Sequence, residues 1–163
     1  MDNETTIFDE LTASSLAVLV RENAWAYPAL ETLHILGIAL VLGGIFLLDL
    51  RLIGFNRNIS FGAMSRHIVP WVMAGIAVNI ATGGLLFISD AAEFAANISF
   101  QIKLVLIALA LANAAVFQAT IGRSASAWDL NVTPPKTARI QGILSILLWV
   151  CVVTAGRMMA YLK

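Results

Sequence analysis

Long runs of apolar residues alternate with short polar stretches along the chain. Four runs, at about 28–50, 68–89, 100–122 and 139–161, each hold roughly the 20 residues that an α-helix needs to cross the hydrocarbon core of a bilayer. Pro28 suits the first turn of the first run, where its missing amide proton would have no partner, and Pro70 takes the same place in the second. The pattern predicts an all-α integral membrane bundle of four transmembrane helices.

The segment before the first run is different, because residues 1–24 mix apolar with charged positions. This amphipathic pattern predicts a short N-terminal interfacial helix, lying on the membrane surface at the mouth of the bundle. The start of the chain has no basic stretch, so we expect no cleavable signal peptide. Since the four runs use most of the 163 residues, we expect a single membrane domain over 1–163.

Charge is distributed unevenly, although the formal net charge is zero. The connections that follow the first and third runs carry Arg51, Arg57, Arg66, Arg123, Lys136 and Arg139 against Asp49 and Asp129. The positive-inside rule therefore places these connections in the cytoplasm and both termini outside. Residues 56–67 are polar enough to form the first connection, which would leave His67 in a loop or at the interface. The cations are too scattered to predict a nucleic-acid partner.

Composition agrees with a lipid environment. Hydrophobic residues make up 60% of the chain and charged residues 12%, with a mean hydropathy of +0.86, whereas soluble proteins have about 25% charged residues. The single cysteine, Cys151, excludes an intrachain disulfide and any CxxC site. No HExxH, GxSxG or phosphate-binding glycine loop is present, so no catalytic residue is predicted.

His34 is the foremost candidate for function, because an ionisable side chain inside a span is costly to keep there. It lies about 10 Å below the start of the first run, at a depth similar to that of Asn79 in the second. Lys103 and Arg157 lie one turn nearer the outer surface. An imidazole for iron, cations for propionates and a small residue such as Gly37 beside a flat ring are what a haem b site needs.

A structural role for His34 is the alternative on spacing alone. The imidazole would then hydrogen-bond across to Asn79 or Thr154, while Lys103 and Arg157 extend to the headgroups. His67 is about 25 Å from His34, too far to bind the same iron, so its role stays open. A second axial ligand would have to be Met158, Met159 or a residue of another protomer.

Small residues recur on the third run, at Ala108, Ala112, Ala115 and Ala119. This stripe predicts a helix-packing face. The methionines are too dispersed along the chain for a copper site built from thioethers.

The stretch LHILGIALVLGGIFLLDLRLIGF resembles the first helix of HemJ-type membrane protoporphyrinogen oxidases, with His34 and Arg51 at the matching positions. FQIKLVLIALALANAAVFQ resembles the lysine-bearing third helix of that family and of CopD-type copper-resistance membrane proteins, with Lys103 at the matching position. The resemblance implies a four-helix, oligomeric, haem b binding protein. Leu50 replaces the family's proline before the arginine, and its tyrosine-histidine pair is absent. The closing segment also resembles small bacterial membrane proteins that carry no function to transfer.

Together these features predict a multi-pass protein of the bacterial inner membrane that binds haem b and works in electron transfer or redox chemistry. Two alternatives remain: a cofactor-free accessory or assembly subunit of a larger membrane complex, and a CopD-like metal or solute permease. Spans two to four carry no acidic residue near mid-membrane, which disfavours a proton-coupled carrier.

Overall fold

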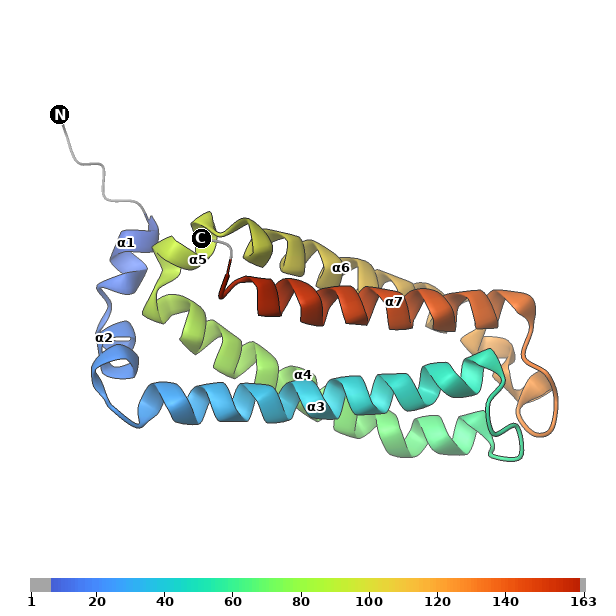
Figure 1. Ribbon diagram of the computed structural model, residues 1–163. Helices are drawn as coiled ribbons and strands as arrows, with labels where there is room; N and C mark the ends of the chain where they lie inside the picture. The colour runs from blue at the N-terminus through green and yellow to red at the C-terminus, as the bar shows by residue number, and fades with distance from the viewer. Residues whose placement is uncertain (1–6, 162–163) are drawn as a thin grey trace.

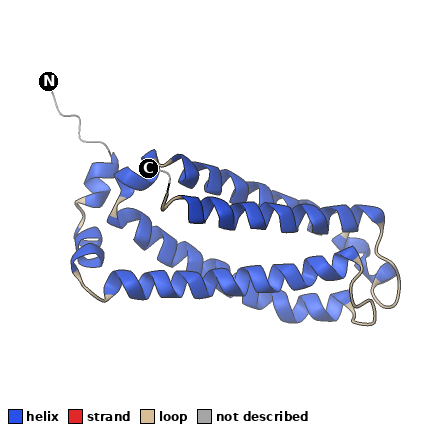
Figure 2. Ribbon diagram, viewed as in Figure 1, coloured by secondary structure: helices blue, strands red, loops and turns tan. Residues whose placement is uncertain are grey.

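The computed structural model describes residues 7–161, and every regular element within them is helical (Figures 1 and 2). In chain order the elements are α1 (Ile7–Thr12), α2 (Ser15–Glu22), α3 (Ala26–Ile53), α4 (Phe61–Ser89), α5 (Ala91–Ala96), α6 (Ile98–Ala119), the 3₁₀ helix η1 (Gly122–Trp128) and α7 (Lys136–Met158). Four of them, α3, α4, α6 and α7, are long and apolar enough to cross a membrane. The predicted all-α bundle of four membrane-spanning helices is confirmed.

The ends of the long helices have local causes. Asn97 begins α6, because its side chain accepts hydrogen bonds from the amides of Ser99 and Phe100. Gly54 ends α3 in the left-handed conformation, with φ at +112°, which a side chain would disfavour. Ser60 caps α4 by accepting from the Ala63 amide at 3.0 Å.

The start of α4 corrects one sequence-based expectation. We expected 56–67 to be a connection and Pro70 to begin the span, but the helix already begins at Phe61. His67 and Pro70 therefore lie within α4. The Ser60 cap fixes the earlier start, and a proline inside a membrane helix is tolerated where neighbouring groups satisfy the freed carbonyl.

The long helices pack in the order α4, α3, α7, α6. The α-carbons of α4 and α6 nowhere approach within 8 Å of each other. Glycines permit the close crossings: a Cβ at Gly75 would lie 2.9 Å from the Gly37 carbonyl oxygen, and one at Gly142 would lie 3.1 Å from the Asp49 carbonyl oxygen. Side chains of all four helices meet in a central core of Val41, Val72, Ala110, Trp149 and Val152.

The alanine stripe of α6 does not face this core. Ala108, Ala112, Ala115 and Ala119 are all exposed, whereas Ala110 and Phe117 are buried. The face of α6 that turns inward instead carries Ala110 and Phe117, with Leu106 and Ile107 packed against the core. No described element of this chain covers the stripe.

The short helices α1 and α2 lie across one end of the bundle, beside α5 (Figure 1). Arg21 donates to the Ser89 carbonyl oxygen at 3.0 Å, and the Thr12 hydroxyl accepts from the Ala91 amide at 3.1 Å. The predicted N-terminal helical segment is thus present, although residues 1–6 of it lie outside the described part. The end of α7 lies at this same end of the bundle.

At the opposite end, the two basic connections are joined by a polar network. The Arg51 side chain, 1% exposed, donates from Nε to the Ile59 carbonyl oxygen at 2.8 Å and from Nη2 to the Asp129 carbonyl oxygen. The Asp129 carboxylate accepts from the Ser60 hydroxyl at 2.6 Å and from the Gly62 amide at 2.7 Å. These bonds lower the pKa of Asp129, with the nearby Arg51 charge adding to the effect.

Asp49 lies one turn before the end of α3 and is also buried, at 5% exposure. Its carboxyl group faces Ser145 of α7, and its Oδ2 atom has no hydrogen-bond partner among the described residues. This acidic residue lies near the end of the first span, as its sequence position indicated, and takes part in the contact between α3 and α7.

Candidate functional site: a histidine between two membrane helices

His34 projects from α3 toward α4 and is half-buried. Its Nδ1 atom lies 2.8 Å from the hydroxyl oxygen of Thr82, which is 5% exposed. The Thr82 hydroxyl donates its single proton to the Val78 carbonyl oxygen at 2.7 Å. Thr82 is therefore the acceptor in its bond to His34, and Nδ1 carries the imidazole proton.

This tautomer leaves Nε2 of the neutral ring with a lone pair. Within residues 7–161, Nε2 has no hydrogen-bond partner. Metal-binding histidines have this arrangement, in which one ring nitrogen donates to an oxygen and the other is free to ligate. The expected bonds from the imidazole to Asn79 or Thr154 are not formed. Thr154 instead donates to the Val150 carbonyl oxygen at 2.9 Å.

Asn79 forms hydrogen bonds to the backbone of α3 beside His34. With its amide oriented to satisfy both atoms, it donates to the His34 carbonyl oxygen at 2.8 Å and accepts from the Ile38 amide at 3.1 Å. Gly37 makes this approach possible, because a Cβ there would lie 2.6 Å from the Asn79 amide. The space at Gly37, which we expected beside a cofactor ring, is occupied here by Asn79 and Gly75.

The imidazole edge lies over Gly83. A Cβ at this position would stand 3.1 Å from Cε1 of His34 and 3.6 Å from Nδ1. Gly75, Asn79 and Gly83 share one face of α4 at four-residue spacing, and that spacing is visible in the sequence. Thr82 is next to Gly83 in the sequence, but no comparable spacing pattern indicated that its hydroxyl would contact His34.

Lys103 approaches the same region from α6. Its side chain passes Gly156 of α7, where a Cβ would be 3.7 Å from Nζ. Its ammonium group acts electrostatically on His34, and among residues 7–161 it has no hydrogen-bond acceptor or ion-pair partner. His34 of α3 and Lys103 of α6 therefore lie within electrostatic range of each other, without a hydrogen bond between them.

Arg157 is placed differently. It is exposed at the end of α7, where it donates from Nη2 to the Tyr161 hydroxyl at 2.9 Å, and its guanidinium carbon lies 5.3 Å from the centre of the Tyr161 ring. Met158 is 37% exposed, and Met159 borders a pocket at the end of the bundle. These three residues lie at the C-terminal end of α7, the end of the bundle that carries α1 and α2.

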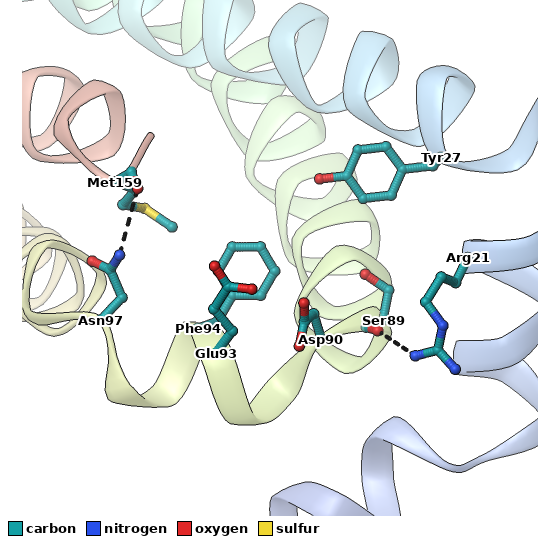
Figure 3. A pocket seen from close by; sticks show the side chains of 8 residues that line it. All are labelled: Arg21, Tyr27, Ser89, Asp90, Glu93, Phe94, Asn97 and Met159. Atoms are coloured by element: carbon teal, nitrogen blue, oxygen red, sulfur yellow. Dashed lines mark hydrogen bonds between the residues drawn. The ribbon is translucent and has the colours of Figure 1, made fainter. Parts of the chain in front are cut away.

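That outer pocket has a volume of about 290 Å³ and a mixed lining (Figure 3). Tyr27 borders it from α3 and Phe94 from α5, with Arg21 and Glu93 as charged groups. Tyr27 precedes His34 by about 10 Å of helix. The pocket therefore lies beyond the imidazole, toward the end of the bundle, and neither His34 nor Lys103 lines it.

The described residues contain no group of three or more His, Cys, Asp or Glu side chains that could hold a metal ion. A bare metal ion coordinated only by such side chains is therefore not supported, whereas a haem iron needs only one or two ligands from protein. Comparison with known proteins gave no match to a family model, to a curated protein or to a solved structure.

Proposed function

We propose that this chain is a bacterial inner-membrane protein that binds haem b through His34 and serves in electron transfer or redox chemistry. The observation that carries the proposal is the hydrogen-bond chain from His34 Nδ1 to Thr82 and on to the Val78 carbonyl oxygen. These two hydrogen bonds keep the proton on Nδ1 and leave the Nε2 lone pair free to ligate iron. A haem held there would supply reversible one-electron chemistry.

The neighbouring residues fit such a group in their chemistry. Lys103 offers a cation without a partner, suited to a propionate, and Gly83 and Gly156 make room for the side chains of His34 and Lys103 beside the helix backbones. Arg157 would have to leave Tyr161 to serve the second propionate. Since Met158 and Met159 lie at the outer end of α7, the second axial position would be open or filled from another protomer.

The decisive test is a reduced-minus-oxidised absorption spectrum of the purified protein together with a haem extraction assay. We expect a b-type spectrum at about one haem per chain, and loss of the haem in His34→Ala. His67→Ala is the matched control, because His67 lies at the other end of α4 and should leave haem content unchanged. Full haem content in His34→Ala would exclude His34 as the ligand.

A cofactor-free subunit of a larger membrane assembly is the second candidate. The exposed alanine stripe of α6, at 108, 112, 115 and 119, favours it, as do Gly43 and Gly84, whose surroundings are open. Such small-residue surfaces let another helix approach closely. If the protein is folded yet spectroscopically flat, Ala112→Leu should disrupt a co-purifying complex or homo-oligomer while His34→Ala is silent.

A further inference from the structure

A groove separate from the pocket of Figure 3 lies at the basic end of the molecule, on the surface of α3 and α4. Its volume is about 430 Å³. Most of its wall is apolar, formed by side chains such as Leu47, Leu50, Met64 and Ile68. It is far from His34 along both helices and takes no part in the function proposed above.

Two nitrogen-bearing side chains make the groove amphipathic. Arg51 lines it, and although this side chain is almost wholly buried, its Nη1 atom has no hydrogen-bond partner among the described residues. His67 lines the groove from α4 and is exposed. A guanidinium nitrogen left unsatisfied in a buried position indicates that a polar partner is missing.

The groove also lies at the right depth for a lipid headgroup. The 29 residues of α4 extend about 43 Å, whereas the hydrocarbon core is about 30 Å thick, so each helix end passes into the headgroup region. His67 is two turns from the start of α4, near the boundary between headgroups and hydrocarbon. Leu47, six residues before the end of α3, lies at the same depth by this measure, and Ile68 follows His67 directly, so both apolar side chains stand where the acyl chains would begin.

We propose that this groove binds one anionic phospholipid of the cytoplasmic leaflet. Its phosphate would be held by His67 and Arg51, and an acyl chain would lie along Leu47 and Ile68. Charge complementarity favours this occupant: the surrounding connections are basic, and basic recesses between membrane helices on the cytoplasmic side recognise acidic headgroups. Arg51 also donates hydrogen bonds to the carbonyl oxygens of Ile59 and Asp129, which lie in the two basic connections. A lipid bound to Arg51 would therefore stabilise both connections.

The test is native mass spectrometry of the purified full-length protein titrated with phosphatidylglycerol or with phosphatidylcholine of the same acyl chains. We expect one phosphatidylglycerol per chain to be retained at about tenfold lower lipid concentration than phosphatidylcholine. Soluble glycerol phosphate at the same concentrations should leave no adduct, because it lacks the acyl chain. Equal retention of the two lipids, or retention of glycerol phosphate, would overturn the proposal.

Two variants test whether the lipid binds in the groove, and both retain Arg51. Ala63→Leu fills the groove and should abolish the preference for phosphatidylglycerol. His67→Ala should weaken retention roughly fivefold, the equivalent of one hydrogen bond of about 1 kcal/mol. Arg66→Ala is the matched control, since Arg66 is adjacent and exposed but does not line the groove. If Arg66→Ala alone reduced retention, the lipid would be responding to surface charge and the groove assignment would be wrong.

Discussion

A threonine hydroxyl has a single proton, and the direction in which Thr82 donates it determines what His34 can do. Because that proton goes to the Val78 carbonyl oxygen, the hydroxyl can only accept from Nδ1. The imidazole is thereby held in the tautomer that leaves the lone pair on Nε2, which the proposed haem would require.

Replacing Thr82 should therefore weaken cofactor binding without touching the ligand. Thr82→Val preserves the shape of the side chain but removes the acceptor, and loss of such a supporting partner costs about 10–100-fold in affinity. Thr82→Ser retains the hydroxyl and should restore binding. Haem titration followed by absorbance measures both variants. Equal affinities for the valine and serine variants would show that the hydrogen bond is irrelevant to the site.

At the scale of helices, the crossing of α3 and α4 determines where His34 points. Gly75 and Gly37 lie backbone to backbone, and a Cβ at Gly75 would stand 2.9 Å from the Gly37 carbonyl oxygen and 2.9 Å from Cγ2 of Val41. The same close approach brings Asn79 to the α3 backbone and Thr82 to the imidazole. Separating the helices here would move the entire hydrogen-bonded group.

Gly75→Ala should consequently destabilise the fold by about 1–3 kcal/mol, the usual cost of overpacking a tight contact. Gly84→Ala is a control on the same helix, because a Cβ there meets nothing within 4 Å. It should stay within about 0.5 kcal/mol of the wild type. Unfolding in a mixed-micelle denaturant titration, followed by near-ultraviolet circular dichroism, compares them. Equal stability of both variants would contradict the close crossing.

The sequence was informative about helices and less so about how they face one another. The extent of an apolar run is a local property, so the four spans were predicted with ends that differ by only a few residues from the helices observed, α4 apart. The earlier start of α4 depends on Ser60 and on contacts of Asp129, which comes from a distant part of the chain. No local pattern records such contacts.

The candidate site, too, could be predicted from the sequence only in part. His34 and Lys103 could be singled out because charged or ionisable groups are rare in spans, and in the structure they lie within electrostatic range of each other. The partnership of Thr82 with His34, and the turning of Arg157 toward Tyr161, depend on how each helix is rotated about its axis. That rotation is set by tertiary packing, so depth alone could not predict it.

For the molecule as a whole, Asp129 joins the two basic connections to each other and to α4. Its pKa is lowered mainly by the hydrogen bonds from Ser60 and Gly62. A carboxyl group with a lowered pKa in the folded state stabilises the fold above its unfolded pKa of about 3.9, and this contribution is lost as the pH falls through the lower folded value.

Asp129→Asn should accordingly lower the thermal midpoint at pH 7 by about 2–4 °C, the shift that about 1 kcal/mol produces in a chain of this size. The difference from the wild type should begin to shrink below about pH 4, where the unfolded chain takes up the proton, and should disappear only below the lower pKa of the folded carboxyl group. Glu22→Gln changes an exposed carboxylate far from this network and should have little effect. A difference that stayed constant down to pH 3 would assign the loss to packing rather than ionisation.

The orientation of the molecule in the membrane follows from which end carries the exposed cations. Arg57, Arg66, Arg123, Lys136 and Arg139 are all exposed at the end opposite α1 and α2. Because Lys and Arg near the ends of spans are retained in the cytoplasm, this end should face inward. The proposed haem site would then lie in the outer half of the membrane, and the lipid groove in the inner half.

Single cysteines introduced into a Cys151→Ser background test this orientation directly. Ala24 and Asn58 are both exposed and lie at opposite ends of α3. A membrane-impermeant maleimide applied to intact spheroplasts should label Ala24→Cys, whereas Asn58→Cys should react only after the membrane is broken. The reverse pattern would place both termini in the cytoplasm. It would move His34 to the inner leaflet, and any redox partner of the site would then have to be cytoplasmic.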